Sequence, residues 1–468
     1  MNRRRFLRRM AAGAGMAAWP WVKAGASASR PNIVFFFVDD QRNDTLGCAG
    51  HPIVRTPNVD RLAAQGVRFE NTFVTTSICA ASRASVFTGL TERTHGYTFG
   101  TPPIRKEDVA TSYPVLLREA GYRTGFIGKF GVNVDGSLDD MFDVHKVLNR
   151  NPYFKEQPDG SKRHVSEIAG DAAAAFLQSQ PDDKPFCLSV SFNAVHAEDG
   201  DKRPGIGHYP WPRAVDGLYE DVAIPPPQLS DPKYFETLPD FLKESMNRER
   251  YFWRWDTPEK YETNMRAYFR MITGVDGVIG RVLETLGTEG MAENTVVIYA
   301  ADNGYYMGDR NFAGKWSHFE QSLRVPLIIY DPRLPATRPG RVAKPMALNI
   351  DVPATVLDMA GLEVPAKYQG RSLMPILRDE IPPDWRTDFF CEHHMDHKLI
   401  PKWEGVRAER YVYARYYEQQ PPYEFLHDLE KDRTQLENFA EVPEYAGILE
   451  KMRARCAAFK ELYPARVR

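Results

Sequence analysis

The sequence has few cysteines, and they lie far apart in the chain. The five are Cys48, Cys79, Cys187, Cys391 and Cys456. No close cysteine pair or Cys/His spacing indicates a zinc site, and a disulfide scaffold is not what holds such a chain together. The sequence also lacks a repeat of fixed period and a strong net charge, since its formal charge is −2 at pH 7. We therefore expect no nucleic-acid partner and no stable membrane insertion.

The sequence does have enough apolar residues for a packed core. Of its 468 residues, 43% are hydrophobic, 12% are aromatic and 26% are charged, which argues against a disordered chain. The length is about three times that of a typical domain. Large α/β enzymes often hold such a length in one or two units, so a small peptide-like module is excluded.

The first 28 residues resemble an export signal. They are basic and contain no acidic residue, and an apolar stretch from Met10 to Val22 is followed by Ala26-Ser27-Ala28, a small-residue cleavage site. That stretch is too short to span a bilayer. The segment Arg3–Arg8 resembles a twin-arginine signal, with a plain Sec signal or a retained anchor as alternatives. We expect an exported protein that is periplasmic or extracellular.

Short apolar runs alternate with helical patterns, which is typical of an α/β fold built from crossover units. Two helices are predicted, from Pro57 to Gly66 and along the apolar stripe Met265–Leu286. Four runs are predicted to be buried strands, namely Ile33–Val38, Phe186–Phe192, Val296–Ala300 and Val325–Tyr330. We predict a large, mostly parallel central sheet flanked by helices. Prolines near residue 380 mark a seam, which predicts a main domain over residues 29–380 and a small C-terminal subdomain over residues 381–468.

Two polar pairs follow two of the predicted strands. Asp39-Asp40 comes directly after the first strand, and Asp302-Asn303 comes after Val296–Ala300 and one alanine. Ligands bind at the carboxyl ends of strands in open α/β sheets, and crowded carboxylates need a counter-charge. Because all four side chains offer only oxygen as a ligand atom, we predict a site for Ca²⁺, with Mg²⁺ as the alternative. A single pair of this kind is more often a helix cap or a turn.

A further motif reads Cys79-Ala80-Ala81-Ser82-Arg83 and continues to Thr88-Gly89. It resembles the C-x-[PA]-S-R-x-x-x-x-T-G signature of the type I sulfatases, which belong to the alkaline-phosphatase-like superfamily. The alternative is a purely structural role, in which Cys79 is a buried cysteine before a helix of small residues. The resemblance implies that a maturing enzyme oxidises Cys79 to Cα-formylglycine, whose hydrate contacts the cation and attacks sulfur. It also implies that Arg83 holds the hydrate.

Other segments resemble the same family in the same order along the chain. The resemblance implies that Lys129 and Lys315 contact the sulfate and that His196 donates a proton to the leaving oxygen. Gly405-Val406-Arg407 and Asp428–Asp432 resemble the C-terminal subdomain of the family, which implies an α+β unit with an antiparallel sheet.

Two positions depart from the family pattern. Gly131 stands where the family usually has a histidine that serves as the base for expelling sulfate, and water or His95 are the candidates for that role. Ala81 stands where proline is common, which leaves open whether an oxygen-dependent or a radical maturing enzyme acts on Cys79.

We therefore expect a sulfatase that cleaves sulfate monoesters of carbohydrates, with aryl sulfates as artificial substrates. Aromatic residues in Tyr209–Trp211 and Tyr251–Trp255 either stack on sugar rings or lie in the core. There are also four polar residues in the predicted C-terminal subdomain, namely Glu392, His393, His394 and His397. They either line the pocket or belong to a solvated loop. The alternatives are a phosphomonoester or phosphonate hydrolase of the same superfamily, which the cysteine signature disfavours, and a non-catalytic binding homologue, which the retained Cys79 and acidic pairs disfavour.

Overall fold

The computed structural model describes residues 30–200, 208–334 and 340–466. The predicted export signal at residues 1–28 lies outside these ranges. Among the residues described, no helix has both the length and the apolar character that a membrane crossing requires.

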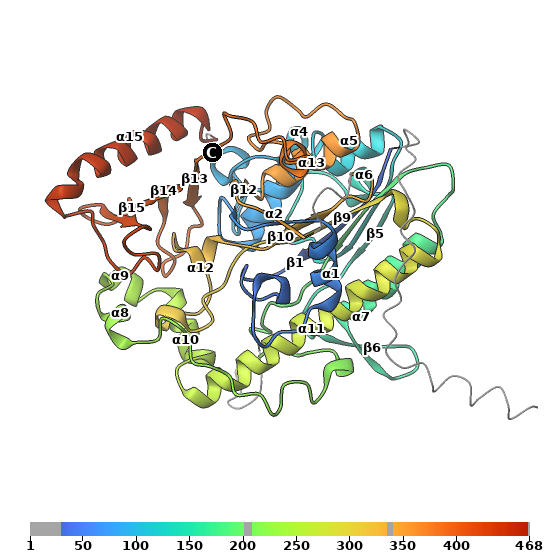
Figure 1. The fold of residues 1–468 in the computed structure, drawn as a ribbon, viewed down its shortest axis with the longest axis horizontal. Helices are drawn as coiled ribbons and strands as arrows, with labels where there is room; N and C mark the ends of the chain where they lie inside the picture. Colours follow the sequence, from blue (N-terminus) through green and yellow to red (C-terminus); the bar gives the residue numbers. More distant parts are fainter. Residues whose placement is uncertain (1–29, 201–207, 335–339, 467–468) are drawn as a thin grey trace, which may run out of the picture.

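The centre of the molecule is an eight-stranded sheet (Figure 1). The strands lie in the order β11 (Arg341–Ala343), β2 (Val67–Phe69), β10 (Leu327–Tyr330), β9 (Thr295–Ala301), β1 (Asn32–Val38), β8 (Phe186–Ser191), β4 (Arg123–Gly128) and β5 (Val144–Val147). Neighbouring strands from β9 to β5 are parallel, whereas β10 is antiparallel to both of its neighbours. The prediction of a large, mostly parallel sheet is confirmed, although the strand predicted from Val325 begins at Leu327 and runs antiparallel.

Helices cover both faces of this sheet (Figure 1). One face packs against α1 (Pro57–Gln65), α7 (Val165–Gln178) and α11 (Pro258–Thr288), and the other against α2 (Cys79–Thr88), α5 (Tyr113–Glu119) and α13 (Asp351–Met359). Successive side chains of a strand point to opposite faces. Accordingly, Val34 and Phe36 of β1 pack with the first set of helices, and Ile33 and Phe35 with the second. A continuously apolar strand is therefore required at this position.

The longest helix, α11, contains the predicted apolar stripe. Thr257 caps its first turn by accepting a hydrogen bond from the backbone N–H of Lys260 at 3.2 Å, and Pro258 occupies the first helical position. The apolar residues between Met265 and Leu286 are buried against the sheet. This stripe belongs to the core.

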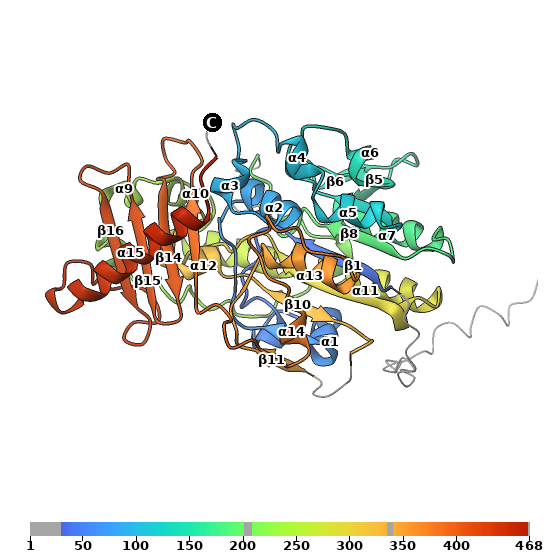
Figure 2. The same cartoon turned by 90° about the horizontal axis from the view of Figure 1, so that it is seen from above.

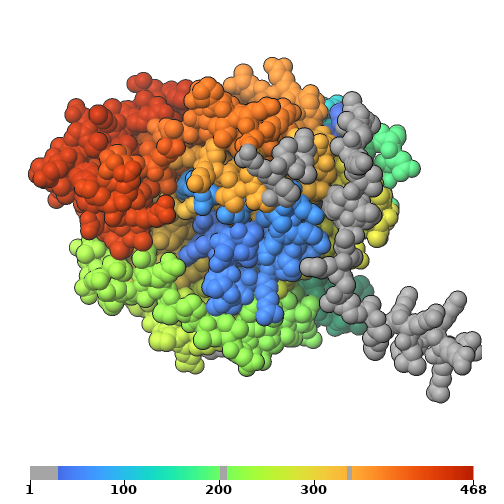
Figure 3. All heavy atoms as spheres, in the orientation of Figure 1, coloured from blue at the N-terminus to red at the C-terminus, as the bar shows by residue number. Residues whose placement is uncertain are grey.

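The C-terminal part of the chain forms a four-stranded antiparallel sheet covered by one helix (Figure 2). Its elements are β13 (Asp388–His393), β14 (Trp403–Ala408), β15 (Tyr411–Tyr416), β16 (Tyr423–Asp428) and α15 (Ala446–Leu462). Phe390 and Val406 pack with α15, whereas Phe389 and Trp403 pack with residues of the main domain. The predicted antiparallel sheet is present, and Figure 3 shows this subdomain at one end of the molecule, in contact with the rest.

A pair of buried histidines joins this subdomain to the main domain. Nε2 of His318 lies 3.1 Å from Nε2 of His427 on β16. Nδ1 of His427 donates to the carbonyl oxygen of Glu437 at 2.7 Å, and Nδ1 of His318 lies 2.9 Å from the hydroxyl of Tyr416. These contacts are all satisfied when both rings are neutral, with Tyr416 donating to His318 and His318 donating to His427.

The histidine pair is expected to make the fold acid-labile. Burial lowers the pKa of His427 to about 4 and that of His318 well below its usual value. The native state therefore stays unprotonated at these rings while the unfolded chain takes up protons below about pH 6.5. For His427 alone, the free energy of unfolding should fall by about 2 kcal/mol between pH 7 and pH 5, as measured by urea denaturation at both values.

The matched variants are His427→Gln and His145→Gln, of which the second changes an exposed histidine on β5. The His427→Gln protein is expected to lose part of the pH dependence, and the His145→Gln protein is expected to keep it. An identical pH dependence in the wild type and His427→Gln would contradict this account.

Candidate active site

The carboxyl ends of β1 and β9 lie side by side, because Val38 pairs with Ala301 in the parallel register. Each strand is followed by one of the two polar pairs. The backbone N–H of Asp40 donates to Oδ1 of Asp302 at 3.1 Å, and Nδ2 of Asn303 donates to Oδ1 of Asp40 at 2.6 Å. All four side chains are buried. The structure thus brings Asp39, Asp40, Asp302 and Asn303 together at one edge of the sheet.

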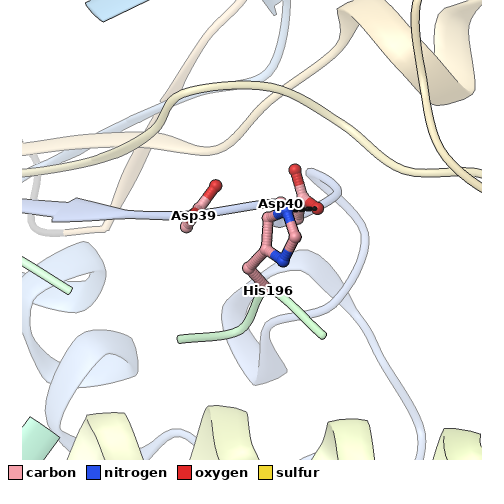
Figure 4. Close-up of side chains that lie close together, drawn as sticks. All are labelled: Asp39, Asp40 and His196. Carbon is pink, nitrogen blue, oxygen red and sulfur yellow. Dashed lines mark ion pairs between the residues drawn. The ribbon is translucent and has the colours of Figure 1, made fainter. Parts of the chain in front are cut away.

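His196 reaches the same place from the segment that follows β8. This segment is fixed to β1 because the backbone N–H of Asp39 donates to Ala194 O at 3.1 Å and that of Val195 donates to Asp39 O at 2.8 Å. Nε2 of His196 lies 3.5 Å from Oδ2 of Asp40 (Figure 4). One ligand atom each from Asp39, Asp40 and His196 lies within 4.8 Å of the others, a group that includes neither Asp302 nor Cys79.

The protonation state of the His196 ring follows from the contact that its Nδ1 atom makes. Nδ1 lies 2.7 Å from the carbonyl oxygen of Ala197, so Nδ1 carries the proton and Nε2 presents a lone pair to the Asp40 carboxylate. Burial lowers the pKa of His196 to about 4 despite the neighbouring charge of Asp40. The ring is therefore neutral at pH 7. It can act as a proton donor only after Nε2 has taken up a proton, whereas its lone pair can bind a cation directly.

Two lysines neutralise the acidic pair of β1. Nζ of Lys129, which follows β4, lies 2.5 Å from Oδ2 of Asp39, and Nζ of Lys315 forms an ion pair with Oδ1 of Asp40. Burial alone would raise the pKa of Asp39, but the charge of Lys129 above all holds it well below its usual value. Both lysines stand beside the cluster of carboxylates, although they are far apart in the sequence.

Arg83 connects the third carboxylate to this cluster. It lies one turn after Cys79 on α2 and is 1% exposed. Nε donates to Oδ2 of Asp302 at 2.8 Å, and Nη1 donates to Lys129 O at 2.7 Å and to the hydroxyl of Ser191 at 2.6 Å. Ser191, the last residue of β8, was not among the predicted site residues. Its polar side chain at the end of an apolar strand was the signal that could have revealed it.

Cys79 is the first residue of α2 and is buried, with 6% of its surface exposed. The first backbone N–H groups of a helix point outward without partners, so the start of α2 is suited to an anion. Burial lowers the pKa of Lys315, but the neighbouring acidic groups Asp40 and Cys79 raise it above its usual value. The link between this helix and the carboxylates is the hydrogen bond from Arg83 to Asp302. All five cysteines are free, as expected for a chain without a disulfide scaffold.

The polar atoms of the cluster fit a hard divalent cation. Three buried oxygens of the cluster have no hydrogen-bond partner within residues 30–200, 208–334 and 340–466, namely Asp39 Oδ1, Asp40 Oδ2 and Asn303 Oδ1. Burial, followed by the charge of Asp39, raises the pKa of Asp302 to about 6. Oxygen donors of this kind prefer Ca²⁺ or Mg²⁺.

Removal of divalent cations is expected to abolish activity and to lower the melting temperature. Chelation would leave the three unpartnered oxygens buried without a counter-charge, at a cost of several kcal/mol. Activity and thermal unfolding should be followed after treatment with EDTA and again after addition of Ca²⁺, Mg²⁺ or Zn²⁺. Recovery with Zn²⁺ alone, or no effect of chelation on either readout, would argue against a hard-cation site.

The position of the missing family histidine is closed in this protein. Gly131 has φ +74°, and a Cβ at this residue would lie 2.7 Å from Cδ of Arg83. His95 does not fill the gap, because Nε2 lies 3.2 Å from the Ser85 hydroxyl and Nδ1 accepts from the backbone N–H of Tyr97 at 3.0 Å. Burial also lowers the pKa of His95 to about 3. Both nitrogens are thus engaged by neighbouring residues.

The polar residues of β13 connect the two domains. Glu392 is buried and accepts hydrogen bonds from the backbone N–H of Arg93 at 2.8 Å and from Nε2 of His394 at 2.7 Å. His393 is also buried. Among the aromatic candidates, Tyr209 and Trp255 belong to the main core, so the core interpretation holds for these two.

Comparison with known proteins agrees with the resemblance to the sulfatases. Residues 31–362 match the model of the Sulfatase family, and residues 308–461 match that of the N-sulphoglucosamine sulphohydrolase C-terminal region. The sequence is 28% identical to an N-acetylglucosamine-6-O-sulfatase of Bacteroides thetaiotaomicron, over 89% of this chain and 84% of that protein.

Two solved structures share the fold. One, determined in complex with its substrate D-glucosamine-2-N,6-O-disulfate, has a TM-score of 0.78 and 25% identity, and the match covers 93% of this chain and 98% of the other. A phosphonate monoester hydrolase from Silicibacter pomeroyi has a TM-score of 0.76 at 22% identity, with 93% and 96% covered, which shows a common fold only. Because the Sulfatase model matches most of the chain, this protein belongs to the sulfatase family of the alkaline-phosphatase-like superfamily and is a sulfatase enzyme.

Proposed function

We propose that this enzyme hydrolyses sulfate monoesters of sulfated carbohydrates, with Cys79 converted to formylglycine as the nucleophile and Ca²⁺ at the carboxylate cluster. The observation that carries the proposal is the convergence of three features at one edge of the sheet. These are the start of α2 at Cys79, the unpartnered oxygens of Asp39, Asp40 and Asn303, and the buried cations Lys129 and Lys315.

The cation, when bound, supplies positive charge, and formylglycine supplies a carbon that bears hydroxyl groups. The protein side chains supply the rest. The ammonium groups of Lys129 and Lys315 are placed to neutralise negative charge on the transferring SO₃ group, and buried charges that are already in position stabilise a transition state without reorganisation. Arg83 keeps Nη2 without a partner, which leaves a donor for an oxygen at residue 79.

His196 is the candidate for proton handling at the leaving group. Its Nε2 faces the cluster, and its Nδ1 is held by Ala197. A ring with a pKa of about 4 in the free enzyme serves as an acid only once a bound sulfate ester has raised that pKa. The negative charge of the substrate acts in that direction.

Two sources support carbohydrate as the substrate class. The relative from Bacteroides thetaiotaomicron is named an N-acetylglucosamine-6-O-sulfatase. The similar solved structure is a complex with its substrate, D-glucosamine-2-N,6-O-disulfate. Export to the periplasm or the cell exterior, proposed from residues 1–28, would place the enzyme where sulfated polysaccharides occur.

The proposal is tested with protein from a host that contains a formylglycine-forming enzyme. Peptide mass spectrometry should find the mass deficit of CH₂SH→CHO at Cys79, and kcat/KM for 4-nitrophenyl sulfate should exceed that for 4-nitrophenyl phosphate and for a phenylphosphonate monoester. An unmodified thiol, or a preference for the phosphonate, would favour the phosphonate hydrolase whose fold this protein shares.

A further inference from the structure

Three arginines surround one aspartate next to the candidate active site. Oδ2 of Asp199 lies 3.2 Å from Nη2 of Arg250 and 3.6 Å from Nη2 of Arg150, and Oδ1 forms an ion pair with Nη2 of Arg254. We call Asp199, Arg150, Arg250 and Arg254 the arginine cluster. In the part of the chain that the structure describes, three arginine side chains thus lie around this one carboxylate.

The cluster is assembled from segments that are distant in the sequence. Arg250 and Arg254 lie one turn apart on α10 (Met246–Arg254), Arg150 follows β5, and Asp199 follows β8. Arg254 is fully buried, whereas the side chains of Arg250, Arg150 and Asp199 are 15%, 24% and 21% exposed. The cluster therefore has a buried base formed by Arg254 and a partly open side formed by the other arginines.

The guanidinium groups of the cluster are incompletely paired. The Nε atoms of Arg150, Arg250 and Arg254 are all buried, and none has a hydrogen-bond partner among the residues that the structure describes. An arginine carries five N–H donors and a carboxylate accepts about four hydrogen bonds, so one aspartate cannot satisfy three arginines. By contrast, Asp351 binds Arg386 and Asp388 binds Arg455 through two hydrogen bonds each. The arginine cluster differs from these two one-to-one ion pairs.

The cluster borders the catalytic machinery on two sides. Asp199 is three residues beyond His196 in the same segment. The guanidinium of Arg250 lies over the ring of Trp316, 4.9 Å from its centre, and over that of Trp253 at 5.6 Å. Trp316 directly follows Lys315, and its Nε1 is buried without a hydrogen-bond partner. A ligand that contacts Lys315 and His196 would have this cluster beside it.

We propose that the arginine cluster binds a second anionic group of the substrate, a carboxylate or a second sulfate, while the sulfate ester occupies the active site. This inference rests on the proposed carbohydrate function. Arg150 and Arg250 would contact the second anion through bidentate hydrogen bonds, and Asp199 and Arg254 would position them. The natural substrate is then a sugar with at least two negative charges, and the cluster determines specificity without touching the reacting atoms.

The test compares matched substrates that differ in one anionic group. D-glucosamine-2-N,6-O-disulfate is paired with N-acetylglucosamine 6-sulfate, and sulfated disaccharides that contain a uronate are paired with their methyl esters. The glucosamine pair tests whether the enzyme recognises a second sulfate, and the disaccharide pairs test whether it recognises a carboxylate. For each pair, kcat/KM is measured, together with inhibition of 4-nitrophenyl sulfate hydrolysis by each sugar. The wild type and two variants are used, Arg250→Gln in the cluster and Arg248→Gln on the same helix, whose guanidinium lies over Phe235 and Phe252.

The wild type is expected to prefer the dianionic member of at least one pair by about tenfold or more, the size of one charge-assisted hydrogen bond. Arg250→Gln should reduce that preference about tenfold, and Arg248→Gln should keep it. The inference is overturned if the wild type neither cleaves nor binds any dianionic sugar better than its partner, or if Arg250→Gln retains the preference. If the wild-type enzyme hydrolyses neither aryl sulfates nor sugar sulfates, the proposed function itself is refuted.

Discussion

Replacing Cys79 with alanine is expected to reduce kcat/KM for sulfate esters by about 10⁴-fold or more, the scale seen when an enzyme loses its nucleophile. The alanine side chain cannot be oxidised to an aldehyde, so no hydroxyl-bearing carbon is present at the start of α2. Lys129, Lys315 and the carboxylate cluster would remain in place. Substrate binding should therefore persist while turnover is lost.

The fold should tolerate this change. The loss of one sulfur atom at a residue that is 6% exposed leaves a small cavity, with an expected cost of about 1 kcal/mol. Cys48→Ala is the matched control, because Cys48 is a free cysteine that is only half-buried and lies outside the site. Activity should be measured with 4-nitrophenyl sulfate and stability by thermal unfolding. Full activity of Cys79→Ala would exclude residue 79 as the nucleophile, whatever its modification.

Replacing Lys315 with alanine is expected to lower kcat/KM by about 10²–10³-fold, the usual effect of removing one preorganised charge-stabilising group. Lys315 is 2% exposed and pairs with Asp40, so its charge acts in a buried setting where electrostatic interactions are strong. Its pKa is raised by Asp40 and Cys79 against the effect of burial. The ammonium group thus stays charged over the whole working pH range, and its loss should appear mainly in kcat.

The stability of Lys315→Ala decides between a catalytic and a structural role. Breaking a buried ion pair costs about 3–5 kcal/mol when the remaining charge is uncompensated, but a cation at the cluster would compensate Asp40. With saturating Ca²⁺, the melting temperature should therefore fall only slightly. Lys460→Ala, which removes the ion pair with Glu404 on β14, serves as the control with unchanged activity. If activity and melting temperature of Lys315→Ala fall in parallel, and cooling restores turnover, the role is structural.

The departure at Gly131 shows what local sequence can and cannot reveal. The sequence identifies the missing histidine because the neighbouring Lys129 is present. It does not reveal that Arg83 packs where a side chain at residue 131 would lie. Nor could it exclude His95, whose two ring nitrogens are engaged by residues close to it in the chain.

Sequence alone determined the features that depend on short stretches of chain. Buried strands are recognisable because both of their faces must be apolar, and the polar pairs at Asp39 and Asp302 stand out because each directly ends such a strand. The motif at Cys79 is equally local. These features were sufficient to predict the central sheet, the family and a cluster of carboxylates at the edge of the sheet.

Tertiary structure alone decided which distant residues meet. The contact of Ser191 with Arg83, the position of His196 beside Asp40 and the arginine cluster around Asp199 join residues from different strands and loops. Such contacts depend on strand order and on the paths of long connections, which the hydrophobic pattern of a single segment does not encode. The chemistry proposed for Cys79 therefore rests on a local motif, whereas the arginines proposed to select the substrate are brought together only in the folded chain.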